Sequence, residues 1–504
     1  MVFCLPFRAK RGSTYQQALG SGITQAARLK SNFWKNYPAL QFSLLFLCGV
    51  GFSWPMLVLW ILCFYRKNII LSLLISLLGF GFFYWQKPSY LEEGFQKKGT
   101  GYFIVESIQK VKNNTFSYKG KFFRFYCEDN TTLKNIPCKI YIRGKKRPPG
   151  NYHYFISGTL SKKTDKFFSF KQDKSAEWLA RKKVYNLVEL RFQTKEKLKK
   201  HLSKKIKNAN VKYLCIALTT GDVESSFLRY VFSRIGLSHI LAISGFHFGL
   251  FVGFLALLLR KILPQKALYW TLLFISFLYL SFIGVSPSVL RAWVIVTLFI
   301  LSKILGKVKS SLNLVGVSLL INLLLSPTDI FHLGFQFSYL SYLAIILFYT
   351  PIDAFFSQII KPRNPKDLPL LSRSVYHFLV SFRKAFSLNI AVHVVITPVL
   401  LYHFCKVPIY TLFYNLFIPP SIGILMYLLV ISLVMPVNWI YFLIEGFSKM
   451  LLKIIVYPPF SLEFFIRFKG LPYWFVLFYL EAILLIVIFH TAQKMHRNLT
   501  SSSL

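Results

Sequence analysis

The stretch Ser238–Leu263, SHILAISGFHFGLFVGFLALLLRKIL, decides the class of fold. Its second half contains no polar side chain before Arg260, and the whole stretch is long enough to cross a bilayer, which takes roughly 20 residues of helix. Its first half nevertheless carries His239, Ser244 and His247. Polar groups at membrane depth usually mark a pathway or a site. The stretch therefore predicts a membrane helix that does more than anchor the chain.

The rest of the 504-residue chain predicts a polytopic α-helical membrane protein, since 54% of its residues are hydrophobic. Three short apolar segments come first, near residues 39–52, 54–65 and 68–86, and the first two could form one kinked span. After residue 212 we expect about nine spans. They lie near residues 238–259, 267–285, 289–305, 311–325, 329–350, 385–403, 409–435 (broken at Pro419-Pro420), 437–457 and 470–490.

A soluble insert separates the two apolar regions. Five short runs rich in aromatic and β-branched residues alternate there with turn signals such as EDN and RPPGN. The runs are residues 102–108, 121–127, 137–142, 151–160 and 166–171. This spacing is typical of a small antiparallel barrel or sandwich, and five strands favour an inserted OB-like β-barrel.

Positive charge is concentrated in the insert. Residues 87–210 hold 30 Lys and Arg against 10 Asp and Glu, which is +20 of the total net charge of +43. The positive-inside rule governs long domains weakly, so a polyanion or an anionic membrane surface is the expected partner. The candidate polyanion-binding residues are Lys121, Arg124, Arg143, Lys145, Lys146 and Arg147.

Two features accompany the barrel. Residues 186–208 place Leu190, Leu198, Leu202 and Ile206 on one helical stripe among lysines, which predicts a basic amphipathic helix lying on membrane lipid. Of the seven cysteines only Cys127 and Cys138 share the insert, and they could form a disulfide in an oxidising compartment or remain separate thiols. No CxxC pattern occurs, and we expect no metal site and no cofactor.

The loops predict the orientation in the membrane. Lys and Arg cluster after the 238–259, 289–305 and 329–350 spans, whereas the alternate loops SPS and SPTD carry none. Loops rich in Lys and Arg stay in the cytoplasm, so the 238–259 helix should begin outside it. Three N-terminal crossings from a cytoplasmic start end on the same side. We therefore expect a multi-pass membrane protein with an extracytoplasmic β-domain.

A continuous helix over residues 238–253 would have two unlike faces. At 100° per residue, His239, Ser244 and His247 fall within roughly 140° of one another. The opposite face carries Gly245, Gly249 and Gly253, which would let a neighbouring helix approach closely. The polar face would then point into the protein or into water, or its histidines would bridge helices within a packed bundle.

Other spans repeat the polar stripe. Arg291 stands at the outer start of its span, and Asn415 precedes the Pro419-Pro420 pair. Two further stripes are Asp329, His332, Gln336 and Tyr339, and Asn389, His393 and Thr397. Acids are scarce within the spans, at Asp329, Glu445 and Glu481. A passage so lined would tolerate an anion better than a cation.

The run Ser238–His247 closely resembles the signature of the ComEC-type competence proteins, the inner-membrane DNA-uptake channels of transformable bacteria. Weaker motifs follow in the order of that family. They are Thr220-Gly221-Asp222, Ser286-Pro287 with Arg291, Ser326-Pro327, Gly334-Phe335-Gln336-Phe337-Ser338, and Asn415 with Pro419. The resemblance covers roughly residues 39–490.

The resemblance implies a channel that passes single-stranded DNA into the cytoplasm during natural transformation. The expected channel-lining residues are His239, Ser244, His247, Arg291, Gln336, Asn389, His393 and Asn415. The expected structural motif residues are Gly245, Gly249, Gly253, Ser286, Pro287, Gly334 and Pro419. In the barrel, cations would gather phosphates, and Phe123, Phe125 and Tyr154 would stack bases unless they form its core.

Many members of that family continue into a metallo-β-lactamase-like domain. None of the ten histidines here forms an HxHxDH cluster, so the resemblance is to the form without that domain, and we expect no enzyme activity. The expected partners are single-stranded DNA, membrane lipid, a DNA-receptor protein, a cytoplasmic helicase or translocase and a separate nuclease; a homodimer is compatible with the sequence. The expected domains are residues 1–38, a basic cytoplasmic N-terminus; 39–86, the N-terminal hydrophobic cluster; 87–186, the β-domain; 187–236, the connecting helix and linker; 237–490, the channel domain; and 491–504, the tail.

Two other hypotheses stay open. An intramembrane serine hydrolase would use Ser244 as nucleophile and His247 as base. A transporter of another anionic polymer or lipid would share every physical feature of the channel. A metal site formed by His239 and His247 is disfavoured, because eight helical residues separate them by about 12 Å.

Overall fold

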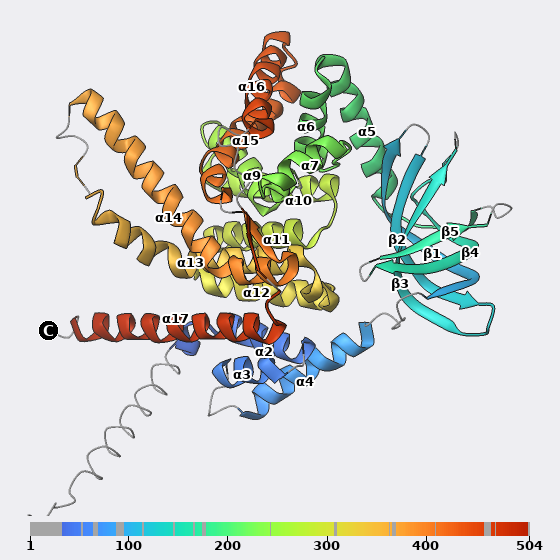
Figure 1. Cartoon of the computed structure of the whole chain (residues 1–504), viewed down its shortest axis with the longest axis horizontal. Coiled ribbons are helices and arrows are strands. Elements are labelled where there is room, and N and C mark those ends of the chain that lie inside the picture. Colours follow the sequence, from blue (N-terminus) through green and yellow to red (C-terminus); the bar gives the residue numbers. More distant parts are fainter. Residues whose placement is uncertain are drawn as a thin grey trace, which may run out of the picture.

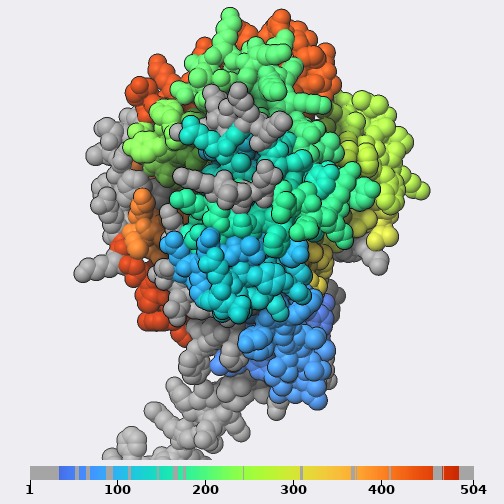
Figure 2. Space-filling model, turned by 90° about the vertical axis from the view of Figure 1, so that its right-hand side faces the viewer, coloured from blue at the N-terminus to red at the C-terminus, as the bar shows by residue number. Residues whose placement is uncertain are grey.

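The computed structural model consists of a helical part with a β-domain beside it (Figure 1). It describes residues 33–51, 54–63, 69–86, 95–112, 115–144, 147–164, 167–173, 178–241, 243–306, 310–361, 363–364, 369–408, 410–457, 465–468 and 470–501. Figure 2 shows the strands at the centre of one face, with α4 (Ile69–Gln86) below them and the helices that follow the β-domain above. The mostly helical architecture with a separate β region agrees with the sequence prediction.

Six helices of the described residues are long and apolar enough to cross a membrane. They are α4, α10 (Gln265–Ile283), α11 (Pro287–Ile304), α13 (Leu333–Ser357), α14 (Leu370–Phe404) and α15 (Thr411–Val434). Shorter apolar helices accompany them: α2 (Pro38–Val50), α9 (Gly245–Leu259), α12 (Ser311–Leu325) and the first half of α17 (Tyr473–Ser501). This set of helices is compatible with a multi-pass membrane protein.

The remaining elements are short or polar. They are α3 (Trp54–Cys63), α5 (Val188–Lys205), α6 (Ala209–Thr220), α7 (Ser226–Arg234), α8 (Ser238–Leu241), the 3-10 helix η2 (Pro327–Phe331), β7 (Lys406–Pro408), α16 (Asn438–Val456) and β8 (Phe465–Arg467). The predicted span at 437–457 corresponds to α16. With Glu445, Lys449 and Lys453 it carries three charges and is not among the six candidates.

Three other spans differ in shape from their prediction. The helix expected at 238–259 is interrupted before Ser244, because α8 ends at Leu241 and α9 begins at Gly245. The span expected from residue 329 starts as η2, and its α-helix begins only at Leu333. The break expected at Pro419-Pro420 does not occur, and α15 runs through both prolines. Prolines are tolerated in membrane helices because neighbouring groups satisfy the freed carbonyls.

All five predicted strands are present in the β-domain. They are β1 (Gln96–Lys112), β2 (Thr115–Cys127), β3 (Thr132–Arg143), β4 (Tyr152–Thr164) and β5 (Phe167–Gln172). Their pairings run β1–β2–β3–β5–β4 and return from β4 to β1, with β3 parallel to β5 and the other pairs antiparallel. A sixth strand, β6 (Leu179–Lys183), pairs with β4; its sequence LARKK gave no strand signal.

The two cysteines of the β-domain are separate buried thiols. Cys138 on β3 lies opposite Gly120 on β2, whereas Cys127 is seven residues further along β2. Seven strand residues span on the order of 20 Å. A disulfide requires Cα atoms within about 7 Å. Of the two possibilities, the structure therefore has the unpaired one.

Of the glycines predicted to allow a close helix contact, only Gly245 lies against a neighbouring helix. An added Cβ at Gly249, Gly253 or Gly334 would meet no atom within 4 Å. A Cβ at Gly316 of α12 would lie only 2.3 Å from the backbone nitrogen of Leu40 in α2. Gly49 and Gly79 make similar backbone contacts between α2 and α4. The N-terminal helices are thus joined through small residues to each other and to α12.

Candidate functional site

The interruption between α8 and α9 places a serine and a histidine at the start of α9. The Ser244 N–H donates to His247 Nδ1 at 3.2 Å, and Ser244 Oγ lies 3.0 Å from the same nitrogen. Because Nδ1 accepts the backbone N–H, a neutral imidazole carries its proton on Nε2. His247 is only 1% exposed, and its Nε2 has no partner among the described residues. The site therefore contains a buried, unsatisfied donor.

Two more predicted histidines lie nearby. His239 of α8 is close enough to His247 and to His393 of α14 for their charges to interact. His393 Nδ1 is 2.9 Å from the carbonyl oxygen of Asn389. In the described part of the chain no group of His, Cys, Asp or Glu side chains could hold a metal ion.

Two asparagines join α14 to α15 beside these histidines. The Asn389 amide donates to the carbonyl of Leu412, and Asn415 Nδ2 donates to Asn389 Oδ1 at 3.5 Å. Asn415 Oδ1 is buried without a partner among the described residues. The two helices are thus held together by polar contacts while one amide oxygen stays open to a further donor.

Arg291 lies against Gly245 at the start of α9. Its guanidinium carbon lies 5.4 Å from the ring centre of Tyr339. The Tyr339 hydroxyl lies 3.1 Å from Ser318 Oγ and accepts from Asn322 Nδ2 at 2.6 Å. This network links α11, α12 and α13, and Ser318 and Asn322 were missed in the sequence because they occur singly within the apolar α12.

The structure therefore brings together most of the predicted lining residues. We call this group the polar cluster: His239, Ser244, His247, Arg291, Asn389, His393 and Asn415. Gly245 links Arg291 to Ser244 and His247, because Arg291 lies against that glycine. Ser286 precedes α11 and Pro287 is its first residue, so Arg291 lies within the first two turns of this helix. Proline at the first helical position is preorganised for a helix start.

Gln336 lies outside the polar cluster. Its side chain donates to the carbonyl of Ile330 at 2.9 Å, and its Oε1 is 3.2 Å from His403 Nε2. Asp329 and His332 pair with each other at 3.8 Å around the end of η2. The helical face predicted over residues 329–339 is therefore wrong in part, because the α-helix begins after His332.

The β-domain carries a basic outer surface. Lys121, Arg124 and Arg143 are exposed, and Lys121 forms a long ion pair with Glu106. Arg147 instead makes two hydrogen bonds to the carboxylate of Glu189. Burial raises the pKa of Glu189, but Arg147 and the Gly150 N–H outweigh it and lower this pKa to about 2. Lys145 and Lys146 lie outside the described residues.

Aromatic side chains divide between the core and the outer surface. Phe125 and Tyr154 are buried in the β-domain core, so they cannot stack on a ligand, whereas Phe123 is 51% exposed. A row missed in the sequence crosses three strands: Arg124 on β2, Tyr102 on β1 and Phe155 on β4 are in register. Tyr102 and Phe155 have ring centres 5.0 Å apart. The row combines a cation with flat apolar faces.

A buried ionic junction connects the β-domain to the helices. Asp222 accepts from Gln109 of β1 at 3.0 Å and pairs with Lys199 of α5 at 2.8 Å and Lys195 at 3.5 Å. Lys195 also donates to the carbonyl of Ile283 at the end of α10. Burial raises the pKa of Asp222, but the two lysines hold it below its ordinary value. The sequence indicated Asp222 as a motif residue but not these partners.

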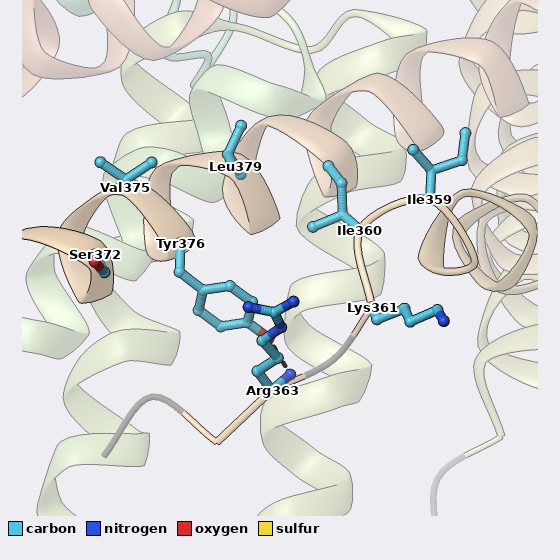
Figure 3. Close-up of a pocket in the computed structure, with 8 residues that line it drawn as sticks. All are labelled: Ile359, Ile360, Lys361, Arg363, Ser372, Val375, Tyr376 and Leu379. Atoms are coloured by element: carbon cyan, nitrogen blue, oxygen red, sulfur yellow. Dashed lines mark hydrogen bonds between the residues drawn. The ribbon is translucent and has the colours of Figure 1, made fainter. Parts of the chain in front are cut away.

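A surface pocket of about 460 Å³ lies apart from the polar cluster, between the end of α13 and the start of α14 (Figure 3). Apolar residues such as Val375 and Leu379 line it together with Lys361 and Arg363. Figure 3 shows the Arg363 side chain beside Tyr376, whose hydroxyl accepts from the Arg363 N–H at 2.7 Å. None of the predicted site residues lines this pocket.

Comparison with protein families matches residues 218–493, more than half of the chain, to the family described as Competence protein. A curated relative, "ComE operon protein 3" of Bacillus subtilis (strain 168), is 34% identical over 136 residues. This alignment covers 26% of the chain and 17% of the relative, so the chain matches less than a fifth of the relative's length. No solved structure matches the chain significantly.

Proposed function

This chain belongs to the Competence protein family, of the ComEC type, and we propose that it passes single-stranded DNA across the inner membrane into the cytoplasm. The observation that carries the proposal is the polar cluster, which gathers side chains from α8, α9, α11, α14 and α15 within the matched region. Polar groups that converge between apolar helices favour a pathway over an anchor.

The β-domain supports the same proposal. The ring of pairings from β1 through β4 favours an OB-like barrel, a fold that often binds single-stranded nucleic acid. Its exposed cations suit a phosphate backbone, and the row of Arg124, Tyr102 and Phe155 suits stacked bases. The charge of the loops favours an extracytoplasmic position for this domain. A DNA-receptor protein, a helicase or translocase and a separate nuclease would then act before and after passage.

The β-domain surface predicts a salt-dependent affinity for DNA. The full chain in neutral nanodiscs should bind oligo-dT, and log affinity should fall steeply with log salt. Replacing Lys121, Arg124 and Arg143 by Gln should reduce that slope by up to roughly 2, because each phosphate contact on a single strand contributes about 0.7. Removing three exposed charges between the end of α9 and the start of α10, Arg260, Lys261 and Lys266, is the matched control. Equal effects of both triple variants would contradict this binding surface.

One observation favours a second function, an intramembrane hydrolase. Ser244 Oγ and His247 Nδ1 are 3.0 Å apart, within the reach expected of a nucleophile and its base. However, His247 Nδ1 also accepts the backbone N–H of Ser244, and no third group orients His247 Nε2 among the described residues. The pair therefore resembles the local contacts of a helix start more than a catalytic dyad.

Two single variants separate the functions. In a strain deleted for this gene, the wild-type chain should restore chromosomal transformation, while the deletion alone still imports DNA as far as the periplasm. His247→Ala should lower or abolish transformation, and Ser244→Ala should only weaken it, because water can replace a hydroxyl in a wet passage. A hydrolase predicts the reverse order, with Ser244→Ala inactive. Transformation frequency at matched membrane abundance is the measurement, and full activity of both variants would remove these groups from the passage.

A further inference from the structure

Arg291 carries a buried charge that no acid of the described residues neutralises. The residue is 8% exposed, and its Nε and Nη1 have no hydrogen-bond partner among the described residues. Its electrostatic neighbours are the aromatic side chains Tyr339 and Tyr342, and no carboxylate of the described chain is close enough to interact with it. Burial of an unpaired cation is strongly unfavourable. Among the described residues the guanidinium therefore has no anionic partner.

This guanidinium lies where two helices begin. A Cβ added to Gly245, the first residue of α9, would lie 2.9 Å from Arg291 Nη2 and 3.7 Å from the carbonyl oxygen of Ser288 in the first turn of α11. The first N–H groups of a helix lack intrahelical partners, and the helix dipole makes this end positive. The positive start of α9 and the guanidinium of Arg291 therefore meet at one point, which favours an anion.

We propose that Arg291 and the first turn of α9 form a binding site for one phosphodiester group of the transported strand. The proposal rests on the passage of single-stranded DNA proposed above and gives that strand a specific contact. The planar fork of an arginine and the N–H groups of a helix start both match phosphate oxygens. Because Gly245 has no side chain, the guanidinium can lie close to the start of α9. A single contact of this kind also lets the strand move on, because conduction needs binding that is readily released.

The first test uses the unliganded protein, the full chain in neutral nanodiscs without DNA or phosphate. Arg291→Met should keep or raise the thermal unfolding midpoint, because it removes a buried charge without a partner. Arg383→Met is the matched control: Arg383 is also buried but pairs with Asp353 at 3.0 Å. The control should lower the midpoint. An equal fall in Arg291→Met would show that Arg291 serves only packing, and would overturn the proposal.

The second test adds an oligo-dT strand and the same strand with an uncharged methylphosphonate backbone. The charged strand should bind the wild type about tenfold or more tightly than Arg291→Met, as expected for a lost hydrogen bond to a charged group. Gly245→Ala keeps the cation but places a Cβ 2.9 Å from it, and should weaken binding in the same direction. The wild type, Arg291→Met and Gly245→Ala should bind the uncharged strand with equal affinity. Unchanged affinity in Arg291→Met would overturn the site.

The remaining outcomes identify other sources of the phosphate group. If inorganic phosphate alone stabilises the wild type as much as the strand does, the site binds a free anion. If anionic lipid stabilises the wild type but not Arg291→Met, and the strand has no further effect, the site binds a lipid headgroup. Either result overturns the strand contact. Wild-type protein that binds no strand at all would instead contradict the proposed function.

Discussion

Gly316→Leu is expected to remove most of the protein from the membrane, whereas Gly249→Leu should leave its abundance unchanged. A side chain at Gly316 would enter the backbone of α2, since its Cβ would lie 2.3 Å from the Leu40 nitrogen and 2.4 Å from the Ala39 carbonyl carbon. Backbone cannot move aside as a flexible side chain does. The cost should exceed the roughly 1–3 kcal/mol of ordinary core overpacking. At Gly249 an added Cβ meets nothing within 4 Å.

The measurement is membrane abundance together with the thermal unfolding midpoint of the purified chain. The two variants carry the same substitution within apolar helices, so differences in hydrophobicity or in synthesis do not separate them. Gly49 offers a repeat of the first result, because its Cβ would lie against the backbone of Ser76 in α4. If Gly249→Leu were lost and Gly316→Leu retained, the packing of α2, α9 and α12 described here would be wrong.

These glycines show which part of the fold a sequence can reveal. The five strands were predictable because buried side chains recur at every second residue of a strand, whichever strand lies beside it. The stripe of Gly245, Gly249 and Gly253 has the same spacing as a helix contact, yet only Gly245 touches a neighbour. Gly316 has no such pattern around it. Which glycine lies at a crossing depends on the angle between helices, and residue spacing does not contain that angle.

The polar cluster was predicted in composition but not in geometry. His239, His247, Arg291 and His393 were identified because each is polar in an apolar span. A single helix over residues 238–259 would place His239 and His247 in the wrong relative directions, because the helix is interrupted before Ser244. The hydrogen bond from the Ser244 N–H to His247 explains that interruption locally, since it satisfies a backbone donor outside the helical ladder.

The second large effect concerns the junction between the β-domain and the helices. Asp222 is 6% exposed and is the carboxylate shared by Lys195 and Lys199. Asp222→Asn keeps the size of the side chain but removes the charge, so two buried ammonium groups lose their common partner. Breaking a buried pair from one side costs about 3–5 kcal/mol. We expect a loss near the lower limit, because Lys199 keeps its contact with Glu224 at 2.9 Å.

The pH dependence of this loss distinguishes an ionic effect from a packing effect. The two lysines hold the pKa of Asp222 below its ordinary value although burial opposes them. A group with a lowered folded-state pKa stabilises the protein fully above its unfolded pKa, about 3.9, and loses that contribution as the pH falls through the folded value. The unfolding midpoints of the wild type and Asp222→Asn should therefore differ most near neutral pH and converge below about pH 4.

Glu224→Gln, which leaves Asp222 in place, should have a smaller effect at every pH. A constant difference between wild type and Asp222→Asn down to pH 3 would show that the carboxylate acts through its shape, and that the charge of the two lysines does not hold the β-domain against α5 and α10.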